Sequence, residues 1–330
     1  MGKDKLLISI IIPLYNTEKY IGECLESIID PEVPSCTYEI IVIDDGSTDK
    51  SGEIVQAFIE HQKNIRLFRQ ENQGVSRARM NGIRQAEGEY IWFIDSDDLL
   101  SQGALPRIIR SIEEESVDVF IHPLLLLYED GRQKIHNEEQ CTQGGTMPGK
   151  IFLQRHPVSI CPPQFVFRKE LCLNPYLFFP EGVRHEDEYF CRVLQYIAPK
   201  VSVSDIPLYI YRQWEGSYMN SAGIQSLYDM VDVYKGLDRF RNDIVSEEDN
   251  DWFKKDILNF LMGTFAWYPE IYHTKEFQSF RKEHGPYIFR EFSHHLRLFS
   301  RKERFLGLLL LQTPSVHRFL LKAKSTIKKY

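Results

Sequence analysis

Three carboxylates follow a short apolar segment near the end of the first third of the chain. Tyr90–Ile94 leads into Asp95, Asp97 and Asp98, with Ser96 between the first two acids. Two carboxylates at positions i and i+2 can both reach one divalent cation. Mg²⁺ and Mn²⁺ prefer oxygen ligands and complete their shells with phosphate and water. The same four residues also suit a simple turn or the N-cap of a following helix.

Polar residues also follow two other apolar segments of strand length. Residues 6–12 precede Pro13-Leu14-Tyr15-Asn16, and residues 38–44 precede Asp45-Gly46-Ser47. In open α/β sheets, ligands bind beyond the carboxyl ends of the strands. Three polar strand ends on one edge therefore favour a binding site over three unrelated turns.

The first 120 residues alternate strand and helix patterns. Strands are expected at 6–12, 38–44, 65–68, 89–95 and 117–123, with helices from Asn16 or Thr17, over 52–62, over 75–86 and after Ser101. Pro13 is expected to end the first strand, and Ser101 to cap the fourth helix. Strands without a polar face, alternating with helices, predict a mainly parallel sheet in an α/β fold.

Taken in order, these segments resemble the successive motifs of family 2 glycosyltransferases with the GT-A fold. The resemblance is carried by ISIIIPLYNTEKYIGECLESI, EIIVIDDGSTDKS, ENQGVSRARMNGIRQAEGEYIWFIDSDDLL and HEDEYF, and covers residues 6–125 closely and 180–217 more loosely. It implies a Rossmann-like three-layer α/β/α sandwich. Residues 1–220 would form the GT-A domain, with 1–125 binding the nucleotide-sugar and 126–220 the acceptor. Residues 221–330 would form a helical extension.

The resemblance also assigns residues to the donor. Asp45 matches the acid that bonds the uracil of a UDP-sugar, and Pro13 and Tyr15 match the segment beside the base. Arg79 matches a cation near the diphosphate. Arg77 competes for that role, and a solvated helix arginine is the alternative reading of Arg79.

A DxD motif of the same family falls on Asp95-Ser96-Asp97. Its first acid contacts the ribose or the metal shell, and its second coordinates Mn²⁺ or Mg²⁺. A cation that bridges the oxygens of a departing diphosphate stabilises the developing charge as a Lewis acid. Asp98 is an additional acid, which can equally cap the next helix.

The acidic run at 186–188 opens a helix expected over 186–198. Read alone, it complements the helix dipole. The resemblance makes Asp187 the general base, with Glu186 as the nearer alternative and Glu188 as the weaker one. Because an ordinary carboxylate is a poor base, burial or nearby negative charge would have to raise its pKa. A base opposite the leaving group implies inversion at the sugar C1. Further on, Arg212 and Trp214 match a possible diphosphate contact and a possible stacking residue.

Composition indicates a globular protein with a charge asymmetry. Six cysteines form no CxxC pair, which favours core positions in a reducing, cytoplasmic compartment. Residues 301–330 carry eight Lys/Arg and one acid, a charge of +7, against −14 for the rest of the chain. Two short helices divided at Thr313-Pro314 are expected there. They would either contact an anionic membrane peripherally or pack on the protein.

The resemblance therefore implies a metal-dependent inverting glycosyltransferase that moves a sugar from a UDP-sugar to an acceptor hydroxyl. The acceptor would be a saccharide or lipid-linked, in cell-surface polysaccharide synthesis, with no nucleic acid partner. The alternative is a non-catalytic nucleotide-sugar-binding or scaffold protein on the same fold. An NAD-dependent oxidoreductase is disfavoured, because IPLYNTEKY stands where GxGxxG would follow the first strand.

Overall fold

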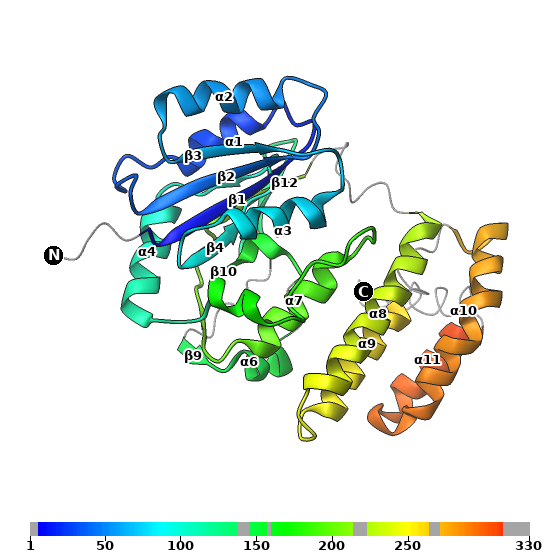
Figure 1. Cartoon of the computed structure of the whole chain (residues 1–330). Coiled ribbons are helices and arrows are strands. Elements are labelled where there is room, and N and C mark those ends of the chain that lie inside the picture. The colour runs from blue at the N-terminus through cyan, green and yellow to red at the C-terminus, as the bar shows by residue number, and fades with distance from the viewer. Residues whose placement is uncertain (1–5, 137–144, 157–159, 214–222, 264–270, 313–330) are drawn as a thin grey trace. The chain divides into compact units, whose positions relative to one another are not determined.

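The computed structural model describes residues 6–136, 145–156, 160–213, 223–263 and 271–312. Within these ranges the chain forms two compact units. The first contains residues 6–182 and 186–213, and the second contains residues 183–185 and 223–312 (Figure 1).

An eight-stranded sheet forms the centre of the first unit. Its strand order is β3 (Ile65–Arg69), β2 (Tyr38–Asp44), β1 (Ile8–Leu14), β4 (Tyr90–Phe93), β10 (Phe165–Arg168), β6 (Val119–Ile121), β11 (Val201–Val203) and β9 (Gly145–Met147). The first four strands pair in parallel, as do β6 and β11. β10 is antiparallel to both β4 and β6, and β9 is antiparallel to β11. The predicted α/β fold with a mainly parallel sheet is confirmed.

Helices cover both faces of this sheet. One layer holds α1 (Ile21–Ile28), α2 (Ser51–His61) and α4 (Ala104–Glu115), and the other holds α3 (Val75–Gln85) and α7 (Glu186–Ile197) (Figure 1). Alternate residues of β1 reach the two layers. Ile10 and Ile12 belong to the core beneath α1 and α4, whereas Ile11 faces α3. A Cβ on Gly82 of α3 would lie 2.2 Å from Ile11 Cγ2, so α3 packs directly on the sheet.

The start of the chain differs from the prediction at two points. β1 continues through Pro13 to Leu14, and Pro13 pairs in register with Ile43 of β2. α1 begins at Ile21 rather than near Asn16. Asn16 has a positive φ of 50°, which is outside the right-handed helical range and delays the helix.

A smaller four-stranded sheet, which the sequence did not predict, follows the turn after β4. Its order is β5 (Leu99–Leu100), β12 (Tyr209–Gln213), β7 (Leu124–Tyr128) and β8 (Gln133–His136). Ser101 does not cap a helix, because its hydroxyl donates to the Pro207 carbonyl at 3.0 Å. α4 begins after Gly103 instead. The shorter elements of the unit are α6 (Gly149–Arg155) and the 3-10 helices η1 (Pro162–Gln164) and η2 (Lys169–Leu173).

The second unit is helical. It contains α8 (Ile224–Ile244), α9 (Asn250–Gly263), α10 (Lys275–His294), η5 (Leu296–Leu298) and α11 (Arg301–Gln312). Buried Lys254 of α9 donates to Asp238 of α8 at 2.8 Å and to Glu291 of α10 at 3.0 Å, which joins three helices. Among the described helices, none is long and apolar enough to cross a bilayer. The second expected tail helix, after Thr313-Pro314, lies outside the described residues.

Candidate active site

The carboxyl ends of β1, β2 and β4 meet at a topological switch point of the sheet. β1 pairs with β2 on one side and with β4 on the other, and the crevice beyond such strands is where α/β proteins bind ligands. Hydrogen bonds join the three loops. Thr48 N–H donates to Asn16 Oδ1 at 2.8 Å, and the Thr17 hydroxyl donates to that of Ser96 at 3.0 Å. The three predicted polar segments therefore lie together.

Tyr15 and Pro13 stand at the end of β1. The Tyr15 side chain is exposed, with 49% of its surface accessible, and Pro13 is half-buried. A ring exposed beside a binding edge suits stacking on a planar group. Their contact with a base stays a prediction.

Asp45 is buried and holds the loop that starts α3. Its Oδ1 accepts from the Gln70 side chain at 2.7 Å and from Gln73 N–H at 2.8 Å, and its Oδ2 accepts from Gly74 N–H at 2.8 Å. Asp45 therefore anchors the start of the helix that carries Arg79. These three donors take three of the about four acceptor positions of a carboxylate, and the contact of Asp45 with uracil stays a prediction.

Arg79 joins the acids after β4 to those at the start of α7. Its Nη2 donates to Asp95 Oδ1 at 2.9 Å, and its Nη1 donates to Glu186 Oε1 at 3.0 Å. The buried guanidinium also lies 5.1 Å from the centre of the Phe179 ring. Burial alone would lower the pKa of Arg79, but Asp95 and Glu186 outweigh burial and raise the pKa. Arg79 is thus a fixed positive charge between two acidic segments about 90 residues apart in the chain.

Asp187 lies beside this bridge, in the first turn of α7. Its Oδ1 accepts from Glu188 N–H at 2.9 Å, and the side chain keeps part of its surface exposed. Burial raises the pKa of Asp187 well above the ordinary value. Glu186 and Glu188 raise that pKa further, and Arg79 opposes them. A carboxyl with a raised pKa is a better proton acceptor once ionised. Asp187 therefore has the electrostatic surroundings of a general base.

Asp97 and Asp95 are half-buried at the end of β4, whereas Asp98 is fully buried. The described residues contain no cluster of three or more His, Cys, Asp or Glu side chains that could hold a metal. Mg²⁺ is commonly held by one or two carboxylates, with phosphate and water supplying the other ligands. Burial is the largest cause that raises the pKa of Asp98, and the charges of Asp97 and Asp95 raise that pKa further. The carboxylate oxygens of Asp95 and Asp97 are suitable ligands for a divalent cation whose other ligands come from a diphosphate and water.

Asp98 has a role that sequence reasoning missed. It caps no helix. Its Oδ2 accepts from the Tyr209 hydroxyl at 2.6 Å, and its Oδ1 accepts from Arg212 N–H at 2.8 Å. The Arg212 side chain pairs with Glu23 and lies 5.5 Å from the centre of the Tyr20 ring. The available signal was the resemblance of residues 208–220 to the family segment that contains the positions of Arg212 and Trp214. Trp214, the candidate stacking residue, lies outside the described residues.

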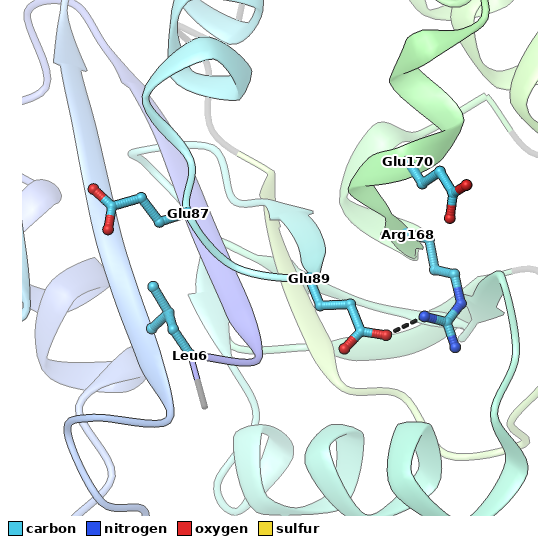
Figure 2. A pocket seen from close by; sticks show the side chains of 5 residues that line it. All are labelled: Leu6, Glu87, Glu89, Arg168 and Glu170. Carbon is cyan, nitrogen blue, oxygen red and sulfur yellow. Dashed lines mark hydrogen bonds and ion pairs between the residues drawn. The ribbon is translucent and has the colours of Figure 1, made fainter. Parts of the chain in front are cut away.

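A hollow of about 520 Å³ opens at the opposite end of the strands. It is lined by Leu6, Glu87, Glu89, Arg168 and Glu170 (Figure 2). Figure 2 shows the Glu89 carboxylate directed at the Arg168 guanidinium. Leu6 precedes β1 and Glu89 precedes β4, so the hollow marks the amino edge of the parallel strands. It is therefore separate from the acids at their carboxyl ends.

Comparison with known proteins identifies the family. The family described as Glycosyl transferase family 2 matches residues 9–173, which is half of the chain. Glycosyltransferase GlyG of Streptococcus pneumoniae is 32% identical over 239 residues, which cover 69% of this chain and 78% of GlyG. This chain belongs to the family 2 glycosyltransferases. TarS of Staphylococcus aureus, named a poly(ribitol-phosphate) beta-N-acetylglucosaminyltransferase, is 28% identical over 78% of this chain. The match spans only 44% of TarS.

Solved structures agree with the fold of a family 2 glycosyltransferase. The crystal structure of S. aureus TarS 1-349 in complex with UDP-GlcNAc matches with a TM-score of 0.71 at 22% identity. The match covers 94% of this chain and 89% of that one. A mannosyltransferase of Pyrobaculum calidifontis, in complex with GDP-Man and Mn²⁺, matches with a TM-score of 0.54 at 16% identity over 94% of this chain and 86% of that one. At these identities the likeness concerns the GT-A fold.

Proposed function

We propose that this glycosyltransferase is a metal-dependent, inverting enzyme that moves a sugar from a UDP-sugar to an acceptor hydroxyl in cell-surface polysaccharide synthesis. One observation carries the proposal. Arg79 bonds both Asp95 of the DxD segment and Glu186 beside Asp187, so the candidate base lies next to the candidate donor site. The TarS relationship supports a UDP-sugar, because TarS was crystallised with UDP-GlcNAc. The name of TarS also supports a cell-wall polymer as acceptor.

Each residue of the proposed site has a limited task. Tyr15 stacks beside the base, Asp45 bonds its edge, and Asp95 contacts the ribose or the metal shell. Asp97 would hold Mn²⁺ or Mg²⁺. When bound, that ion would neutralise the charge that builds on the leaving diphosphate. Fixed charges in a partly dehydrated site are effective here because they need no reorganisation during the reaction.

Asp187 removes the proton from the acceptor hydroxyl as the hydroxyl oxygen attacks C1 of the sugar and UDP departs. A single base, with no second carboxylate acting as nucleophile, implies one direct displacement. An α-linked donor therefore gives a β-linked product. The negative charge of Glu186 and Glu188 makes Asp187 a stronger base, and Arg79 keeps the acidic cluster in place.

The decisive experiment compares the wild type with Asp187→Asn. The wild type should bind UDP with Mn²⁺ and release UDP from a UDP-sugar when an acceptor is supplied. Asp187→Asn should keep UDP affinity and lose about 10²- to 10⁴-fold in transfer, the usual contribution of a general base. Glu181→Gln, at an exposed acid that pairs with Arg77, is the matched control and should keep activity.

If Asp187→Asn transfers sugar at the wild-type rate, Asp187 is not the general base. Donor binding without transfer by either protein, across a panel of acceptors, would instead favour the non-catalytic scaffold.

We also propose that the end of the second unit contacts an anionic membrane surface, which would bring the enzyme to a lipid-linked acceptor. The supporting observation is on α11. There the Phe305 side chain is 63% exposed, and Arg301 and Lys302 are exposed in the preceding turn. An apolar ring next to cationic side chains suits the interface of an anionic bilayer.

A further inference from the structure

The four residues Asp95–Asp98 form a closed turn with a polar inner side. Asp98 N–H donates to the Asp95 carbonyl at 3.0 Å, which closes the turn. Asp95 and Asp97 keep part of their surface exposed, whereas the Asp98 side chain has none. The turn is therefore fixed to the protein interior through Asp98, while Asp95 and Asp97 reach the surface.

Tyr209 of β12 is the residue that holds this turn from the inner side. Its hydroxyl is fully buried, donates to Asp98 Oδ2 at 2.6 Å, and accepts from Asp95 N–H at 3.1 Å. One phenol oxygen thus contacts the first and the last residue of the turn. Arg212 N–H donates to the other Asp98 oxygen, Oδ1, at 2.8 Å. Tyr209 also pairs with Leu100 of β5, which follows the turn directly.

We propose that Tyr209 is a positioning residue for donor binding, which holds the Asp95–Asp98 turn in its binding geometry before the donor arrives. This inference rests on the proposed function, because it takes Asp95 and Asp97 to face the diphosphate and its cation. Tyr209 itself would contact neither the diphosphate nor the cation, because it acts through the turn. The second sheet therefore has a task in the donor site that its place in the sequence does not reveal.

The expected effect follows from what a phenylalanine would leave behind. Tyr209→Phe keeps the ring but leaves one oxygen of the buried Asp98 without its donor and Asp95 N–H without its acceptor. A buried polar group left without its hydrogen-bond partner is costly. The turn is expected to relax, and affinity for UDP with Mn²⁺ to fall by about tenfold or more.

The experiment compares Tyr209→Phe with Tyr90→Phe. Tyr90 is also buried, and its hydroxyl donates to the Val117 carbonyl at 2.7 Å, so its loss has a similar structural cost outside the site. Three quantities are measured for each full-length protein. These are the melting temperature, the amide hydrogen exchange of residues 94–100, and the calorimetric affinity for UDP at fixed Mn²⁺. The KM for the donor and kcat are measured alongside.

The inference predicts that only Tyr209→Phe exchanges faster at residues 94–100 and binds UDP about tenfold more weakly, with the donor KM changing more than kcat. Asp98→Asn is the second variant. It keeps the size of the side chain but replaces one acceptor oxygen with an NH₂ donor. One of the bonds from the Tyr209 hydroxyl and Arg212 N–H is therefore lost, and both readouts should change in the same direction. Equal UDP affinity in Tyr209→Phe and the wild type, or an equal loss in Tyr90→Phe, overturns the inference. A wild type that does not bind UDP overturns the proposed function itself.

Discussion

At the scale of single residues, the charge around Asp187 links the proposed chemistry to folding stability. Burial, Glu186 and Glu188 raise its pKa in the folded protein, and Arg79 opposes them. The folded chain therefore keeps the Asp187 proton over a pH range in which the unfolded chain, with an aspartate pKa near 3.9, has lost it. By linkage, the free energy of unfolding falls as pH rises through this window. Above the window, the ionised Asp187 destabilises the folded protein to its full extent.

Asp187→Asn removes the ionisable group, so we expect this variant to be more stable than the wild type at about pH 8. The difference should shrink as pH falls toward about 4, and each unit of pKa displacement corresponds to about 1.4 kcal/mol. Urea unfolding of both proteins across this range, without donor or metal, measures the effect. Asp130→Asn is the control, because Arg132 lowers the pKa of Asp130 and no gain is expected there. A constant difference at every pH would contradict the prediction.

At the scale of elements, the placement of α3 depends on a close approach to β1. Gly82 brings the helix onto Ile11, and the same helix carries Arg79 toward Asp95 and Glu186. A larger residue at position 82 would displace the helix from the sheet. It would therefore move the Arg79 bridge as well as disturb the core.

Gly82→Ala should lower the free energy of unfolding by about 1–3 kcal/mol, the usual cost of overpacking a core. Gly22→Ala in α1 is the matched control. There an added Cβ meets Ile54 Cγ2 at 3.8 Å, an ordinary contact, so better helix propensity should add about 0.5–1 kcal/mol. Chemical unfolding of the two variants gives the comparison. Equal stability of the pair would show that α3 does not pack as tightly as the structure indicates.

The sequence predicted elements that depend on local patterns better than it predicted long-range contacts. Residues 38–44 were expected as a strand and form β2 over the same bounds, because an apolar run and a turn define it locally. Asp98 could be read only as a turn or cap residue, since its partner Tyr209 lies 111 residues later. The antiparallel insertion of β10 and the second sheet depend on such distant pairings and left no periodic signal.

The candidate site shows the same division between local and distant information. The family motifs led to Arg79, Asp95 and Asp187, but they gave no sign that Arg79 bonds two carboxylates. Nor did they indicate that Asp45 accepts hydrogen bonds from the segment before α3. Those bonds depend on how residues 70–74 fold. Motifs name the residue types at a site, whereas their partners are set by packing.

At the scale of the whole molecule, charge is unevenly distributed. The last thirty residues carry +7, and the other 300 carry −14. An acidic body weakens general attraction to anionic surfaces, so any membrane contact would be confined to one end of the chain. The division of function among residues 1–125, 126–220 and 221–330 stays a prediction.

We expect the full-length protein to sediment with vesicles that contain anionic lipid and not with purely zwitterionic ones. Each Lys or Arg near such a surface contributes about 1 kcal/mol, so the binding should weaken as salt is raised. Phe305→Ser should reduce the bound fraction. Phe289→Ser, at a 41% exposed ring on α10, is the control and should not. Equal sedimentation with both lipid compositions would exclude the proposed contact.

Pro13 sets a boundary between β1 and β4. The Ile11 carbonyl accepts from Ile94 N–H, so odd-numbered residues of β1 direct their backbone groups toward the β4 side. β4 ends at Phe93, and the next odd position of β1 is a proline, which has no N–H to donate. Pro13 therefore cannot donate to a carbonyl of the segment after β4, and Asp95 N–H donates instead to the Tyr209 hydroxyl of the second sheet. The point at which Asp95 leaves the sheet is thus marked in β1 by the covalent structure of one imino acid, whatever ligand is present.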